Sequence, residues 1–80
     1  MENKQHQHIK ALEDLGAEEV TLTPHEILPG YKEINVKVVG AQFLHDIESY
    51  ILENFTRYMS ICGVDDVFVI TFCVWRWHYA

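Results

Sequence analysis

The sequence predicts a single α+β domain that spans all 80 residues, with elements in the order α-β-β-α-β. Residues 4–15 and 41–62 carry apolar side chains at helical spacing, whereas residues 20–24 and 31–39 alternate between apolar and polar side chains. The segment 66–79 is rich in β-branched and aromatic residues, which is typical of a strand. We therefore expect a three-stranded mixed sheet with both helices on one face.

The first half of the chain predicts a helix followed by an antiparallel hairpin. Gly16 is placed to end the first helix. Pro24 closes the first strand, and Pro29 and Gly30 then predict a turn in which Gly30 takes the positive φ. The strand 31–39 alternates cleanly, so we expect one of its faces to contact water.

The segment 41–62 predicts a long helix, and Gly63 fits its C-cap. Apolar residues recur in it at intervals of three and four: Leu44, Ile47, Ile51, Phe55, Tyr58 and Cys62. About 22 residues give a rod of roughly 33 Å, long enough to cover a small sheet. A strand–helix–strand crossover of this kind is right-handed. We therefore expect the second and third strands to be parallel.

The last predicted strand is apolar on both faces for most of its length. Its even-numbered face consists of Phe68, Ile70, Phe72, Val74, Arg76 and His78. Its odd-numbered face consists of Val67, Val69, Thr71, Cys73, Trp75, Trp77 and Tyr79. We expect the even-numbered face to contact the helices and the odd-numbered face to point outward. Two helices cover only one face of a sheet, so the sequence predicts a homodimer that covers the other.

The end of the chain is the predicted partner-binding site, which consists of Trp75, Arg76, Trp77, His78 and Tyr79. Trp, Tyr and Arg are the residue types enriched at binding hot spots. In the alternative interpretation, Trp75 and Trp77 fold under the first helix and complete the core.

The net charge of −6 argues against a general affinity for nucleic acid or anionic membranes, because both need a basic surface. No apolar run approaches the roughly 20 residues that span a bilayer. The first residues contain no apolar stretch of the kind found in signal peptides. We therefore expect a cytoplasmic protein whose partner is another protein.

No catalytic residue, cofactor site or metal site is predicted. Paired catalytic carboxylates converge from different elements, whereas Asp65 and Asp66 are adjacent in sequence. Cys62 and Cys73 lie too far apart for a Cys-x-x-Cys site and are too few for a disulfide scaffold. We therefore expect a protein that is not an enzyme.

These observations predict a small acidic interaction domain that binds another macromolecule as an inhibitor or modulator. Virus-encoded inhibitors of host defence enzymes often have this format, although no sequence motif supports the analogy. One alternative is a single-stranded nucleic-acid binder that stacks bases on Trp75, Trp77 and Tyr79 beside Arg76. Another is a small-molecule binding or acid–base catalytic domain with a pocket near His45 or His78.

Overall fold

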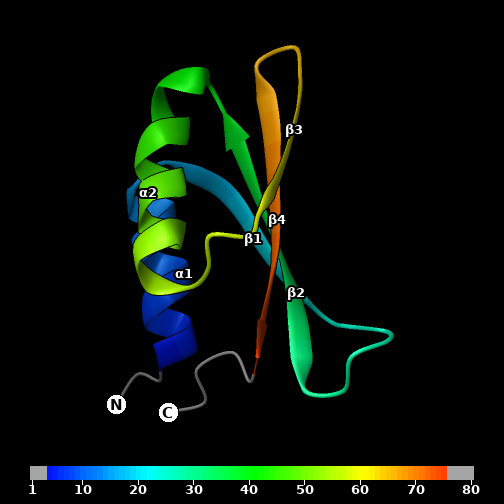
Figure 1. The fold of residues 1–80 in the computed structure, drawn as a ribbon. Helices are drawn as coiled ribbons and strands as arrows, with labels where there is room; N and C mark the ends of the chain where they lie inside the picture. The colour runs from blue at the N-terminus through cyan, green and yellow to red at the C-terminus, as the bar shows by residue number, and fades with distance from the viewer. Residues whose placement is uncertain (1–3, 76–80) are drawn as a thin grey trace.

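Four antiparallel strands form one sheet, and both helices lie on the same face of it (Figure 1). The computed structural model describes residues 4–75. In chain order the elements are α1 (Lys4–Asp14), β1 (Ala17–Pro24), β2 (Tyr31–Val39), the 3₁₀ turn η1 (Ala41–Phe43), α2 (Leu44–Asn54), β3 (Ser60–Val64) and β4 (Val67–Trp75). The strand order is β1-β2-β4-β3. The α+β class and the two helices predicted from the sequence are confirmed.

The predicted three-stranded mixed sheet is wrong, because residues that we expected in a helix form the additional strand β3. This strand pairs antiparallel with β4, from Val64 opposite Val67 to Ser60 opposite Thr71. Its insertion between α2 and β4 reverses the chain once more, so β4 runs antiparallel to β2. The parallel crossover that we expected between these two strands is therefore replaced by two adjacent hairpins.

The predicted helix 41–62 ends at Asn54 in the structure. The Asn54 Nδ2 donates a hydrogen bond to the carbonyl oxygen of Tyr50 at 3.0 Å, and the N–H groups of Phe55 and Thr56 both donate to the carbonyl oxygen of Ile51, one of the last helical carbonyls. Phe55 then leaves the helical conformation, with φ −128° and ψ −71°. The residues that follow include β-branched residues and Gly63. These residue types have a lower helix propensity than alanine or leucine.

The turn between β3 and β4 explains why these residues pair as strands. Asp65 has φ 51° and Asp66 has φ 64°. Positive φ at both central residues is the requirement of a type I′ hairpin, whose twist matches that of the flanking strands.

The first hairpin is confirmed, since β1 and β2 pair antiparallel and β2 has the predicted bounds. The Tyr31 N–H donates to the carbonyl oxygen of Leu28 at 3.2 Å across the turn, and Gly30 takes the expected positive φ, 86°. β1 begins earlier than predicted, at Ala17, with an irregularity in register between Ala17 and Glu19.

The core lies between the helices and the inner face of the sheet, which is the face that they cover. Its buried residues are Leu12, Ala17, Ile34, Val36, Val38, Ile47, Ile51, Ile70, Phe72 and Val74. The prediction that Ile70, Phe72 and Val74 face the helices is therefore confirmed. Neither helix of the described residues is long and apolar enough to cross a membrane.

Candidate interaction site

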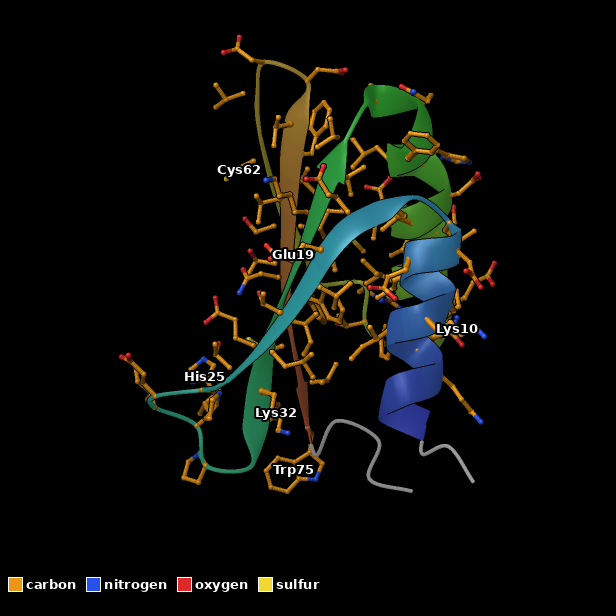
Figure 2. The ribbon with its side chains drawn as sticks, turned by 180° about the vertical axis from the view of Figure 1, so that it is seen from behind. Lys10, Glu19, His25, Lys32, Cys62 and Trp75 are labelled. Atoms are coloured by element: carbon orange, nitrogen blue, oxygen red, sulfur yellow. The ribbon has the colours of Figure 1, made fainter. Side chains whose placement is uncertain are left out.

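The outer face of the sheet, opposite the helices, has no covering layer among the described residues (Figures 1 and 2). Its centre is polar: the Thr71 hydroxyl donates to Asn35 Oδ1 at 2.8 Å. The end nearest the β3–β4 turn is apolar, with Val39, Val64 and Val69 all exposed. A sheet that contacts water on one face normally carries polar residues there, so this apolar end is a candidate contact surface.

Trp75 lies at the opposite end of the same face, at the end of β4. Its side chain is 52% exposed, although its ring lies 5.0 Å, centroid to centroid, from the ring of Tyr31. The two residues are direct cross-strand neighbours in the β2–β4 ladder. A Cβ atom added at Gly30 would overlap the Trp75 ring. The indole can therefore pack against the backbone at this position because residue 30 is a glycine. Trp75 is therefore both held in position and open to a partner.

The loop between β1 and β2, whose Gly30 lies against Trp75, carries further exposed aliphatic side chains. Ile27 is 80% exposed, and Leu28 is also exposed. The backbone N–H groups of both residues donate to His25 Nδ1, at 3.2 Å and 3.1 Å. Because Nδ1 accepts both bonds, the proton of a neutral His25 is on Nε2. The imidazole thus fixes a loop that presents apolar side chains to solvent.

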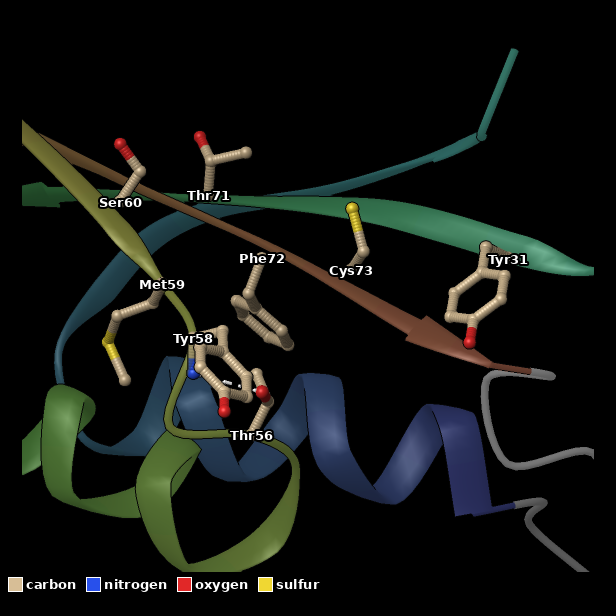
Figure 3. Close-up of a pocket in the computed structure, with 8 residues that line it drawn as sticks. All are labelled: Tyr31, Thr56, Tyr58, Met59, Ser60, Thr71, Phe72 and Cys73. Carbon is tan, nitrogen blue, oxygen red and sulfur yellow. Dashed lines mark hydrogen bonds between the residues drawn. The ribbon is translucent and has the colours of Figure 1, made fainter. Parts of the chain in front are cut away.

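A groove opens along the side of β4 where β3 ends. The β3–β4 ladder stops at Ser60 opposite Thr71, and residues 55–59 turn away toward α2. Figure 3 shows the resulting opening, which has a volume of about 640 Å³. Its lining residues are Tyr31, Thr56, Tyr58, Met59, Ser60, Thr71, Phe72 and Cys73.

A second, smaller groove of about 300 Å³ continues in the direction of Trp75. Thr56 and Cys73 line both grooves, which places the two openings end to end. Together with the Tyr31–Trp75 pair, the grooves form one continuous candidate interaction site at this end of the sheet.

Charges of both signs lie near this site, since Arg57 stands between the lining residues Thr56 and Tyr58, and Lys32 stands opposite Val74. Glu33 lies directly opposite Cys73 in the β2–β4 ladder. Farther along the outer face, Lys37 Nζ lies 3.8 Å from Glu18 Oε1, an exposed pair in which the lysine is already engaged. The net charge of −6 and the position of Glu33 beside Cys73 favour a partner with neutral or basic character on the outer face.

The acid–base chemistry of the described residues is limited. His8 Nδ1 and the Tyr50 hydroxyl form a hydrogen bond of 2.7 Å, in which the His8 tautomer determines the donor. Burial raises the pKa of Tyr50 above its usual value, which keeps the phenol neutral. Their neighbour Phe55 packs against His8 and Phe72, with ring centroids 4.7 Å and 5.3 Å away. The pair is therefore part of a packed aromatic cluster, and no groove described above is lined by either residue.

No group of three His, Cys, Asp or Glu residues within 4–75 is arranged to hold a metal ion. His45, the described histidine that we considered for a catalytic pocket, is exposed on α2 and lines neither groove.

Of the five predicted site residues, the structure describes Trp75 alone. The other four, Arg76, Trp77, His78 and Tyr79, lie outside the described residues. Trp75 is on the outer face, as the alternation of the strand predicts, and it is not among the buried core residues. The alternative interpretation also concerns Trp77, which lies outside the described residues.

Sequence reasoning missed Tyr31, Tyr58 and Met59 as parts of the site. Tyr58 was expected in the apolar stripe of the long helix, but it is 81% exposed in the loop before β3. The available signal was the pair Asp65–Asp66 between Val64 and Val67, which marks a two-residue hairpin and hence a strand before it.

No family model, no curated protein and no solved structure matches this chain. The interpretation of the site therefore depends on its geometry and chemistry.

Proposed function

We propose that this chain is a small acidic interaction domain of the cytoplasm, not an enzyme, that binds another protein through the surface around Trp75. The proposed surface also includes Arg76, Trp77, His78 and Tyr79. The domain acts by occupying a surface of its partner, as an inhibitor or a modulator does. The free thiols support the proposed location in the cytoplasm, because Cys62 is exposed and reduced thiols persist in that compartment.

The observation that carries the proposal is the exposure of Trp75. Burial of a tryptophan side chain in a core of this size would stabilise the fold by several kcal/mol. The side chain of Trp75, however, remains 52% exposed. It is nevertheless positioned by Tyr31 and Gly30. A rigid, exposed aromatic side chain beside a groove is the usual anatomy of a binding hot spot.

Self-association through the outer face is the second part of the proposal. Exposed Val39, Val64 and Val69 support it, because they give the uncovered face an apolar end. In a homodimer of this kind, the same patch on two copies would remove these side chains from water.

Differential capture from a lysate of the source cells tests partner binding. The bait proteins are the wild type, Trp75→Ala, and Leu52→Ala as a matched control, since Leu52 is equally exposed but on α2. We expect the wild type and the control to retain a protein that Trp75→Ala loses, with all three folded by circular dichroism. Identical captured proteins for all three baits would contradict the proposal.

Light scattering at micromolar concentration tests self-association. We expect a dimer for the wild type and a monomer for Val69→Lys, which places a charge in the apolar end of the outer face. A monomeric wild type would overturn the homodimer. The same samples should show no retention of single-stranded oligonucleotides, because the net charge of −6 repels phosphates.

A further inference from the structure

The backbone of β4 points some of its hydrogen-bonding groups into the groove. The Gly40 N–H donates to the carbonyl oxygen of Asp66 at 2.8 Å, between the chain that follows β2 and the chain that precedes β4. Backbone hydrogen-bonding groups alternate in direction along an antiparallel strand. The backbone N–H and C=O groups of the even-numbered residues of β4 therefore point toward β2. The N–H and C=O of Cys73 therefore point to the other side. On that side β3 has already ended, since its last pair is Ser60 opposite Thr71.

The loop before β3 does not supply partners for these groups. In the β3–β4 register, Tyr58 is the residue that would stand opposite Cys73. Its N–H instead donates to Thr56 Oγ1 at 3.0 Å. The N–H of Thr56 donates to the carbonyl oxygen of Ile51 at 3.1 Å, at the end of α2. These two N–H groups are thus satisfied by Thr56 and α2, and the ladder position beside Cys73 is not taken by Tyr58.

We infer that the protein partner contributes an extended peptide segment, which adds beside Cys73 as an antiparallel strand in line with β3. This inference rests on the proposed function and identifies the kind of partner segment that the site accepts. Strand addition supplies main-chain hydrogen bonds for affinity, while pockets for alternate side chains supply specificity. The groove of about 640 Å³ has room for such side chains.

The two faces of the sheet determine the sequence pattern of the segment. The position opposite Phe72 is that of Met59, which precedes β3 directly, so the first open inward-facing position is opposite Val74. A peptide residue there points to the inner side, where Phe55 and Val74 line the smaller groove, so this position requires an apolar residue. A residue opposite Cys73 points to the outer side, where Glu33 lies beyond Cys73 on the next strand, β2. A lysine or arginine is favoured there. The expected segment therefore alternates basic and apolar residues.

The test uses a defined set of N-acetylated pentapeptides, Lys-Φ-Lys-Φ-Lys, where Φ is Val, Ile, Leu, Phe, Tyr or Trp. Binding is measured by fluorescence anisotropy, with Glu-Φ-Glu-Φ-Glu peptides as the charge control. For the best binder, two methylated versions are compared. N-methylation of the lysines blocks the amides that face β4, whereas N-methylation of the Φ residues alters amides that point away from it. We expect at least a tenfold loss of affinity for the first version only.

Two protein variants supply the reciprocal test. Cys73→Pro removes the N–H that faces the groove, and proline is tolerated at an edge position of this kind. Cys73→Val retains the N–H and is the matched control. We expect at least a tenfold weaker complex for Cys73→Pro than for Cys73→Val. If Cys73→Pro does not fold, the methylated peptides still decide the question, because they leave the protein unchanged.

Three results would overturn the strand addition: no peptide of the set binds, both methylated versions bind equally well, or the two Cys73 variants bind equally well. Partner capture that is lost in Trp75→Ala but retained in Cys73→Pro would leave the proposed function in place and remove this inference. A Cys73→Pro variant that changes only the oligomeric state would assign the edge to a second copy of the chain, which also contradicts a peptide partner.

Discussion

Asp66 Oδ1 accepts the backbone N–H of Ala41 at 3.1 Å, which connects the β3–β4 turn to the start of η1. The carbonyl oxygen of the same residue accepts the N–H of Gly40 at 2.8 Å. One turn residue in the left-handed conformation, with φ 64°, thus holds two segments that are distant in sequence.

Replacement of Asp66 by alanine should lower the free energy of unfolding by about 1–2 kcal/mol, because an exposed first-turn N–H loses its acceptor and alanine tolerates positive φ poorly. Urea denaturation measures the change. Asp65→Ala is the matched control, since Asp65 also has positive φ (51°) but forms no such bond with η1. A loss of stability equal in both variants would show that the contact with Ala41 contributes nothing.

Ile51→Ala should destabilise the fold by about 2–5 kcal/mol, the usual range for a large aliphatic side chain removed from a core. Ile51 is fully buried on α2, whereas its neighbour Leu52 is 50% exposed. Leu52→Ala should therefore change the free energy of unfolding by less than about 0.5 kcal/mol. Comparable losses in the two variants, measured by thermal and urea denaturation, would contradict the orientation of α2.

Stability should fall in alkali as Tyr50 ionises. Burial raises the pKa of Tyr50 in the folded state, so its stabilising contribution is complete below about pH 10, the usual tyrosine value, and is lost as the pH rises through the folded-state pKa. Tyr50→Phe should abolish this part of the pH dependence. At pH 7 it should cost about 0.5–1.5 kcal/mol, because the hydrogen bond with His8 is lost. Denaturation curves of both proteins at pH 7 and pH 11 give the comparison; parallel pH profiles would refute the prediction.

Gly30→Ala should displace the Trp75 indole and destabilise the first hairpin by about 1 kcal/mol or more, since Gly30 has φ 86° and its added Cβ would overlap the ring. Tryptophan emission in a Trp77→Phe background reports on Trp75 alone. We expect a shifted emission maximum for Gly30→Ala and an unchanged one for Glu26→Ala, an exposed position in the same loop. An unchanged spectrum in both variants would show that Gly30 does not position the indole.

The first hairpin was predictable because its signals are local. The alternation of β2 and the Pro29–Gly30 turn each involve neighbours in the chain, and both agree with the structure. The same locality explains the error at β3. Ile51, Phe55, Tyr58 and Cys62 fit a helical period, although the helix ends at Asn54, before the last three of them. Periodicity alone could not show that a turn at Asp65 would draw the last of these residues into a sheet.

Part of the candidate site was predictable for a similar reason. The outward orientation of Trp75 follows from the alternation of β4. The pairing of Trp75 with Tyr31 depends on the register of two distant strands, and the groove depends on where β3 stops. These are tertiary features, so they became visible only in the folded chain.

The strand order also has a consequence for the speed of folding. β1–β2 and β3–β4 are hairpins that close over short turns, whereas β2 and β4 pair residues that α2 separates in the chain. Closing that longer loop costs more conformational entropy, and non-local pairing of this kind slows folding. We therefore expect the pairing of the two hairpins to limit the folding rate, with Val36 opposite Ile70 where the halves of the sheet join. Substitutions at this central seam should then alter the folding rate, whereas substitutions at the outer edges of β1 and β3 should act mainly on the unfolding rate.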